Sequence, residues 1–155
     1  MPWTYVIDKA REFLWARASG AVTEAEVTIG VAKAIRDPDF GAHYRLLLDY
    51  SEATSMSLSV DTVARLARSS VFSPQSRRAF LGTTPLGFGM GRMYEIYASL
   101  GETPTPVRVF RDRASALAWL NSDVPPEMVI EEGSLASMVG VDDQPVVQAA
   151  HAGRE

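Results

Sequence analysis

Short runs of apolar and β-branched residues alternate with longer amphipathic segments through the first 121 residues. The short runs are typical of strands, and the longer segments, with apolar residues three and four positions apart, are typical of helices. The expected strands cover residues 3–7, 12–17, 44–49, 78–83 and 107–110. The expected helices cover residues 27–35, 60–71, 90–100 and 113–121. The predicted order of elements is therefore ββαβαβαβα.

Polar residues mark the ends of several of these elements. Thr23 and Glu26 have the spacing of a capping box, and Pro38 stops the helix that follows. Asp112 is placed to cap the last helix. The serine- and threonine-rich residues 51–59 are expected to form a turn.

The alternation of strands and helices predicts an α/β fold. Strands separated by helices pair in parallel through right-handed crossovers. The first two strands are joined directly, so they form a hairpin that ends at Gly20 and adds an antiparallel edge. Residues 44–49 are almost continuously apolar, as expected of a strand covered on both faces. These features together predict a mixed five-stranded sheet.

The pattern changes after Asn121, where Pro125 and Pro126 interrupt the chain. Beyond Asp123 there are six acids and one base, which gives this segment a net charge of −5 and leaves +1 on the body. We therefore expect an α/β domain over residues 1–123 and an acidic tail over 124–155. Residues 128–130 and 135–141 either dock on the body or form a short helix, and about the last ten residues are expected to be mobile.

Composition narrows the class of protein. Hydrophobic residues make up 46% of the chain and charged residues 22%, as in an ordinary globular domain. There is no apolar run of about 18 residues and no secretory leader, and the chain has no cysteine, so we expect a cytoplasmic protein without disulfides. A body with almost no net charge argues against nucleic-acid binding, which needs a basic surface.

The stretch GTTPLGFGMGR, residues 82–92, is the part of the sequence that most resembles a nucleotide-binding loop. A phosphate-binding loop needs Lys and Ser or Thr after its last glycine, but here Phe88 and Gly89 occupy those positions. A dinucleotide-binding fingerprint needs G-x-G-x-x-G, but Gly87, Gly89 and Gly91 give G-x-G-x-G. We therefore interpret the stretch as a packing turn and predict no nucleotide cofactor.

Candidate catalytic and metal-binding residues are few. The two histidines, His43 and His151, lie in an expected loop and in the tail, and no spacing of His, Asp and Glu resembles a metal-ligand set. No cysteine nucleophile exists, and no histidine is close to a plausible nucleophilic serine. The sequence therefore predicts a protein that is not an enzyme and holds no metal or other cofactor.

Several blocks of the first 121 residues are similar to SpoIIAA-like proteins of the STAS (sulfate transporter and anti-sigma factor antagonist) superfamily. The similar blocks are LLLDYS (46–51), RAF (78–80), GFGMGRMY (87–94), VRVFRD (107–112) and ALAWL (116–120). The resemblance implies a mixed sheet with helices mainly on one face, which agrees with the order of elements. It also implies a non-catalytic binding or regulatory module.

The resemblance also bears on phosphorylation. Antagonists of this superfamily carry a D-S-S-G motif at a helix start, where the first serine is phosphorylated. The matching positions are Ser57, Leu58, Ser59 and Val60, so Leu58 stands at the phosphoacceptor position. If the register slips by one residue, Ser57 or Ser59 becomes the phosphoacceptor of an anti-sigma-factor-antagonist-type regulator. Otherwise one of these serines is simply a helix N-cap.

Apolar residues in the expected turns predict a binding surface. Met56, Leu58, Phe72, Leu86 and Phe88 are expected at the carboxyl ends of strands, the edge at which open α/β sheets bind ligands. Such residues need a cover: the tail, a second copy of the chain in a homodimer, a protein partner, an apolar small molecule or a membrane surface. Arg92, near a helix start, calls for either a carboxylate partner or an anionic ligand. The predicted binding residues are Met56, Leu58, Leu86, Phe88, Met90 and Arg92.

Overall fold

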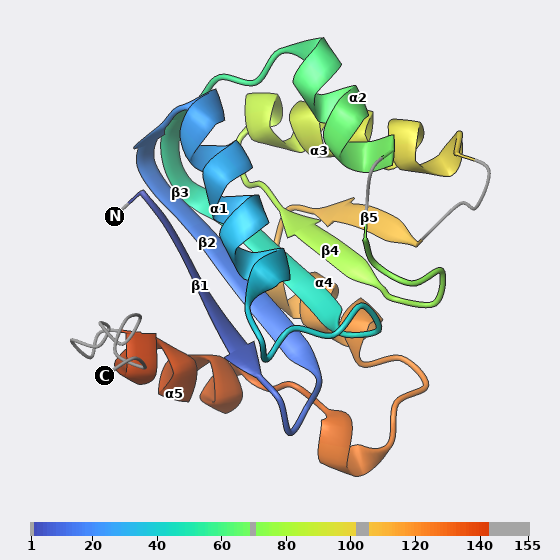
Figure 1. Ribbon diagram of the computed structural model, residues 1–155. Helices are drawn as coiled ribbons and strands as arrows, with labels where there is room; N and C mark the ends of the chain where they lie inside the picture. The colour runs from blue at the N-terminus through green and yellow to red at the C-terminus, as the bar shows by residue number, and fades with distance from the viewer. Residues whose placement is uncertain (1, 69–70, 102–105, 143–155) are drawn as a thin grey trace.

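The computed structural model describes residues 2–68, 71–101 and 106–142, with side chains described as far as Met138. A five-stranded sheet lies at the centre of the molecule and carries helices on both faces (Figure 1). The strands are β1 (Trp3–Asp8), β2 (Phe13–Val22), β3 (Arg45–Met56), β4 (Arg78–Leu81) and β5 (Val107–Phe110). The helices are α1 (Glu24–Arg36), α2 (Val60–Arg68), α3 (Pro85–Ser99), α4 (Arg113–Leu120), the short 3-10 helix η1 (Pro126–Met128) and α5 (Glu132–Asp142).

The strands lie in the order β1-β2-β3-β4-β5. β1 pairs with β2 in antiparallel fashion, and the other neighbouring pairs are parallel. The predicted order of elements, the mixed sheet and the antiparallel edge are therefore confirmed. No described helix is long and apolar enough to cross a membrane.

Two strands are longer than the sequence pattern predicts. β2 does not end at Gly20 but continues to Val22, and β3 runs on to Met56 through part of the segment that was expected to be a turn. The two extensions pair with each other, with register shifts near Gly20, whose φ of 67° favours glycine. Serine and threonine are tolerated there because the neighbouring strand supplies hydrogen-bond partners for their backbone groups.

Local capping signals correctly locate two helix starts. The Glu26 N–H donates to Thr23 Oγ1 at 3.1 Å, and the Thr23 N–H donates to Glu26 Oε1 at 2.9 Å, which confirms the capping box. Asp112 Oδ1 accepts from the Ser115 N–H at the start of α4. The start of α3 was predicted too late, because Thr84 caps a helix that already begins at Pro85.

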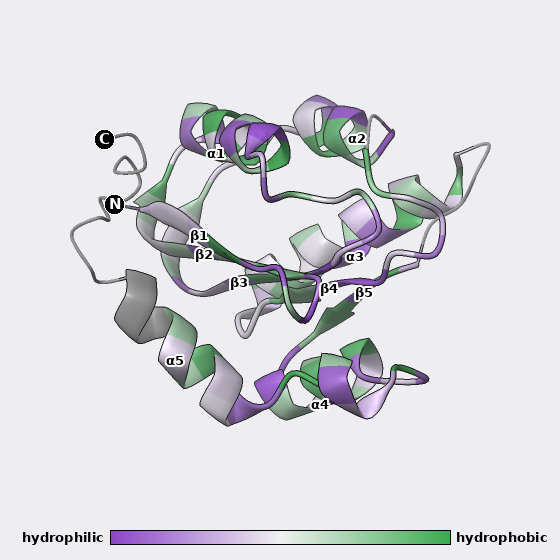
Figure 2. Cartoon of the chain, turned by 60° about the horizontal axis from the view of Figure 1, so that its bottom comes forward, coloured by the Kyte–Doolittle hydropathy of each residue, from purple (hydrophilic) through white to green (hydrophobic). Residues whose placement is uncertain are grey.

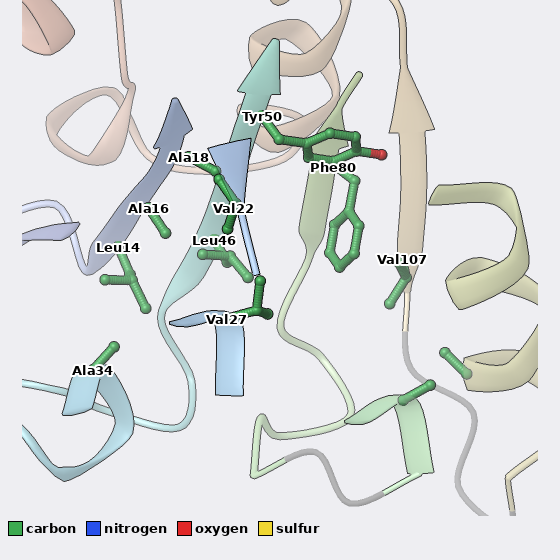
Figure 3. Packing of buried hydrophobic residues seen from close by; sticks show 12 residues of the cluster. Leu14, Ala16, Ala18, Val22, Val27, Ala34, Leu46, Tyr50, Phe80 and Val107 are labelled. Carbon is green, nitrogen blue, oxygen red and sulfur yellow. The ribbon is translucent and has the colours of Figure 1, made fainter. Parts of the chain in front are cut away.

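The two faces of the sheet carry separate apolar cores. α1, α2 and α3 cover the first face, and α4 and α5 cover the second (Figure 2). Figure 3 shows the first core, in which Leu14 of β2 lies near Ala34 and Leu46 of β3 near Val27 of α1, while Phe80 of β4 lies beside Tyr50. Three of the five described α-helices thus lie on one face, in agreement with the predicted fold class.

The chain after Asp123 contributes to the second core. Ile130, Leu135 and Met138 are buried there, with Leu135 only 1% exposed. A buried Arg45 guanidinium donates to the carbonyl oxygens of Leu120, at 3.0 Å, and Met128, and so ties this segment to β3. The last residues, expected to be mobile, and His151 lie outside the described residues.

Candidate functional site

A cavity of about 270 Å³ lies between the first face of the sheet and the helices α1, α2 and α3. Its walls are made almost entirely of apolar side chains. The sheet contributes Leu14, Ala16, Leu46, Leu48, Tyr50 and Phe80. Helices α1 to α3 and the segment after α2 contribute Val27, Val31, Ile35, Val63, Leu66, Phe72, Met90 and Tyr94. Such a volume is near the lower end of the range for small-molecule sites.

The sequence builds this cavity with amphipathic helices and small residues. Val27, Val31 and Ile35 recur at helical spacing and direct one apolar stripe of α1 to the cavity. Ala16 on β2 and Ala32 on α1 also line it, and their methyl groups leave space that larger residues would fill.

The hydroxyl groups that line the cavity are already engaged inside the protein. Thr28 donates to the Glu24 carbonyl oxygen at 3.0 Å, and Tyr50 donates to the Gly87 carbonyl oxygen at 2.7 Å. Tyr94 accepts from Arg78 Nη1 at 3.3 Å. Burial raises the pKa of both Tyr50 and Tyr94, so these phenols stay neutral at physiological pH.

Trp3 also lines the cavity. Its indole Nε1 is buried and has no hydrogen-bond partner among the described residues. The ring packs on Gly30 of α1, where an added Cβ would lie 2.3 Å from the indole. Gly30 therefore allows Trp3 to approach α1 at this end of the cavity.

Glu24 joins the beginnings of the two helices α1 and α2. Its Oε2 accepts from Thr62 Oγ1 at 2.5 Å, and its Oε1 accepts from the Ser59 N–H at 3.0 Å. The bond from Thr62 and then the bond from Ser59 hold the pKa of the Glu24 carboxyl below its usual value. The positive end of α2 is thus already occupied by a carboxylate of the protein.

The glycine-rich stretch 82–92 packs against Tyr50. A Cβ added at Gly82 or Gly91 would lie 2.6 Å from the Tyr50 side chain, and at Gly91 also 2.4 Å from Val109. A Cβ at Gly89 would meet nothing within 4 Å. Gly82 and Gly91 therefore form a close helix–sheet contact, as the packing interpretation predicts, whereas Gly89, which was expected to pack closely too, does not.

Only part of the predicted binding set meets in the cavity. Met56, Leu58 and Met90 line it. Leu86 is 78% exposed and lies outside it, in α3 and not in a turn. Phe88 also lies in α3 and stacks under Arg111, whose Cζ is 3.8 Å from the ring centroid.

The structure also shows where two other residues singled out in the sequence, Phe72 and Arg92, are placed. Phe72 lines the cavity, but it precedes β4 and so lies toward the amino end of that strand, contrary to the prediction. Arg92 Nη1 pairs with Glu95 Oε2 at 2.9 Å, which is the carboxylate partner that its place in the helix requires.

The two candidate phosphoacceptors lie at the start of α2 and are exposed. Ser59 is the N-cap, because its Oγ accepts from the Thr62 N–H at 3.1 Å. Its own N–H is held by Glu24. Ser57 precedes it in the connection from β3.

The acidic and histidine side chains of the described residues do not gather into a metal site. No group of three or more His, Asp and Glu among these residues is placed to hold a metal ion. His43 is exposed and lies 3.3 Å from Glu12 Oε2, on the surface.

Sequence reasoning missed much of the cavity wall. Trp3, Val31 and Ile35 have the spacing of ordinary core residues, and nothing in their pattern distinguishes a tightly packed core from one that encloses a cavity. The available signal for a cavity was the small size of Ala32 and Ala34 on α1 and of Ala16 on β2, all of which line it.

No protein-family model and no curated protein matches the chain. Among solved structures, it is similar to an uncharacterised protein of the DUF3478 family with a SpoIIAA-like fold from Shewanella loihica PV-4. The two share 21% sequence identity with a TM-score of 0.51, and the match covers 76% of this chain and 93% of the other. This similarity confirms the SpoIIAA-like fold that the sequence blocks indicate.

Proposed function

We propose that this chain is a non-catalytic binding domain whose ligand is an apolar small molecule held between α1, α2, α3 and the sheet. The observation that carries the proposal is the apolar cavity of about 270 Å³, whose hydroxyl groups are hydrogen-bonded within the protein. When an apolar ligand leaves water and enters the cavity, its binding is favoured by about 25 cal/mol for each Å² of apolar surface removed from water.

The wall sets no polar requirement for this ligand. The Trp3 Nε1 has no hydrogen-bond partner among the described residues, but it is buried against Gly30 of α1, so a molecule in the cavity does not reach it. The ligand class is therefore an apolar molecule, for which 1-octanol serves as a probe.

The chemistry of the wall supports binding and not catalysis. The side chains that line the cavity include no carboxylate, imidazole, amine or thiol. Its titratable groups, Tyr50 and Tyr94, are kept neutral by burial because burial raises the pKa of each. The hydroxyl groups of Thr28, Tyr50 and Tyr94 are the wall's candidates for proton transfer or nucleophilic attack, and each is hydrogen-bonded within the protein with no base of the wall beside it.

The test uses 1-octanol as the probe and two variants of α1. Ala32 lines the cavity, whereas Ala25 is exposed on the same helix and does not line it. We expect 1-octanol to shift the Trp3 indole signal in NMR spectra of the full chain. Ala32→Phe should abolish that shift by filling the cavity, and Ala25→Phe should leave it unchanged.

The contrary outcomes point to other sites. Equal binding by Ala32→Phe and the parent protein would remove the cavity proposal. Recovery of the protein with liposomes, without any octanol shift, would favour a membrane surface that contacts exposed side chains such as Leu86, which is 78% exposed.

The geometry at α2 disfavours the alternative of a regulator phosphorylated on Ser59. A phosphate on Ser59 would face the Glu24 carboxylate that already accepts the Ser59 N–H, and like charges repel. Ser57, which is exposed, is therefore the remaining candidate phosphoacceptor. Detection of phosphate on Ser57 after co-expression with a kinase would support the regulator.

A further inference from the structure

The outer edge of β1 is an open side of the sheet. β1 stands at one end of the strand order, and among the described residues it pairs with β2 alone (Figure 1). Its pairing with β2 runs without the register shifts that interrupt the pairing of β2 with β3. A regular strand of six residues with one unpaired edge can accept a further strand through main-chain hydrogen bonds.

The hydrogen bonds between β1 and β2 show which backbone groups lie on the open edge. The Ser19 N–H donates to the Pro2 carbonyl oxygen at 2.8 Å, so Pro2 faces β2. Hydrogen-bonded pairs alternate with non-bonded pairs along an antiparallel ladder, so every second residue after Pro2 also faces β2. The backbone N–H and C=O groups of Trp3, Tyr5 and Ile7 therefore point away from the sheet, and no other described segment bonds to them.

The side chains of these three residues are already used inside the protein. All three pack against the first core, and Tyr5 Oη donates to Asp37 Oδ2 at 2.8 Å. Val6 packs against the second core on the opposite face. The open edge therefore offers backbone groups, and the partner that fits it is another strand.

The other end of the sheet is protected in a way that β1 is not. β5 has only four residues, and the Val109 N–H donates to Glu95 Oε1 of α3 at 3.3 Å instead of remaining available to a strand. Arg108 also places an exposed cation on β5. Short length and charged side chains are common means of protecting a sheet edge. The sequence of β1, WTYVID, has no proline and no basic residue.

The spacing of the open groups selects a second copy of β1 as the partner. Trp3 and Ile7 stand at equal distances along the strand on either side of Tyr5. A copy turned by 180° therefore places Trp3 opposite Ile7 and Tyr5 opposite Tyr5, so that every outward N–H meets an outward C=O. In the same register Thr4 stands opposite Val6. All of these pairs are aromatic or β-branched, and no like charges oppose each other.

We propose that the chain forms a homodimer in which two β1 strands pair in antiparallel fashion about a two-fold axis at Tyr5. Such an interface uses the same patch on both copies and joins the two sheets into one. Main-chain bonds along one short strand bury little area, but α1 and α5 both contact β1 and would lie beside their copies. The proposal does not depend on the apolar cavity.

Amide hydrogen exchange, followed by NMR on the ¹⁵N-labelled full chain, tests the pairing. At a concentration at which sedimentation velocity gives twice the mass of the chain, we expect the Trp3, Tyr5 and Ile7 amides to be protected from exchange. Dilution to the monomer should remove this protection, because their acceptors lie on the second copy. The amides of Thr4 and Val6, which bond to β2, should stay protected in both states.

Two substitutions at Ile7 separate pairing from folding. Ile7→Pro removes an N–H that β2 does not use, and proline is tolerated at such positions of an edge strand. It should keep the circular dichroism of the parent protein but remain a monomer at concentrations at which the parent is a dimer. Ile7→Val keeps the N–H and should dimerise as the parent does.

Several results would overturn the proposal. One is a parent protein that stays a monomer at the concentrations used for NMR, and another is a dimer in which the Trp3, Tyr5 and Ile7 amides exchange freely. Protection of these amides that does not change on dilution would place a segment of the same chain on the edge. A folded Ile7→Pro that dimerises as well as the parent would also contradict it, and if this variant does not fold, the exchange of the parent decides.

Discussion

Tyr50 Oη donates a 2.7 Å hydrogen bond to the carbonyl oxygen of Gly87 and so fixes the first turn of α3 against β3. The same ring occupies the space beside Gly82 and Gly91 where side chains would otherwise stand. The stretch resembles a phosphate-binding loop in sequence, but the Tyr50 ring fills the space beside its glycines. The glycines serve a close contact between the helix and the sheet.

Because of this contact, we expect substitutions at two glycines of α3 to have opposite effects on stability. Gly91→Ala places a Cβ 2.4 Å from Val109 Cγ2, so we expect it to lower the free energy of unfolding by about 1–3 kcal/mol. Gly89→Ala meets nothing within 4 Å and removes a flexible residue from a helix, so it should raise that free energy by up to about 1 kcal/mol. Urea denaturation of the two variants and the parent measures both changes, and a Gly91→Ala variant as stable as Gly89→Ala would contradict the packing account.

Tyr50 also predicts a loss of stability in alkali. The unfolded chain releases the phenol proton near pH 10, but burial raises the pKa of Tyr50 in the folded state. Above about pH 10 the unfolded state therefore binds fewer protons, and the free energy of unfolding falls by about 1.4 kcal/mol per pH unit from this group until the folded phenol titrates.

The variant Tyr50→Phe separates this contribution from the others. Tyr5, whose pKa is raised by burial and by its bond to Asp37, and Tyr94, whose pKa is raised by burial, still titrate in it. Urea denaturation between about pH 9 and pH 11 should show a shallower decline for Tyr50→Phe than for the parent protein. Parallel declines would mean that Tyr50 ionises as easily in the folded protein as in the unfolded chain.

Features set by neighbouring residues were predictable from the sequence. The capping box of Thr23 and Glu26 and the cap at Asp112 depend on residues three positions apart, and both are present. The parallel pairs and the antiparallel edge follow from the alternation of strands and helices after a direct hairpin connection. These rules are local, so a single sequence contains them.

Features that depend on distant pairing were not predictable in the same way. The strand from Ser51 to Met56 exists because β2 lies beside it, although its serines and threonine suggest a turn. The cavity depends on how far α1 and α2 stand from the sheet, and the periodicity of Val27, Val31 and Ile35 is the same for a filled core.

The link between α1 and α2 predicts a change in the titration of Glu24. Thr62→Val keeps the shape of a buried side chain but removes the hydroxyl that most lowers the pKa of the Glu24 carboxyl. That pKa should therefore rise toward its usual value of about 4.3. Carbon NMR of the side-chain carboxyl during an acid titration measures it directly, with Thr54→Val, exposed on β3, as the matched control.

The sign of the associated stability change follows from the lowered value. A carboxyl with a depressed folded pKa stabilises the folded state above its unfolded pKa, and this contribution is lost as the pH falls through the folded value. The parent protein should consequently lose more stability than Thr62→Val on acidification below about pH 4.5. An unchanged Glu24 titration in Thr62→Val would show that the hydroxyl does not hold the carboxylate.

The burial of Leu135 predicts that α5 is part of the cooperative fold, which is the docked alternative for this part of the acidic tail. Leu135→Ala removes a side chain that is 1% exposed in the second core, so it should lower the free energy of unfolding by about 2–5 kcal/mol. Ser137→Ala, exposed on the same helix, should change it by less than about 0.5 kcal/mol. Urea unfolding followed by tryptophan fluorescence and by far-ultraviolet circular dichroism should give one coincident transition for each protein, because Leu135 and Trp15 share a core. If Leu135→Ala is as stable as Ser137→Ala, α5 adds nothing to the domain and the boundary near residue 123 is the correct one.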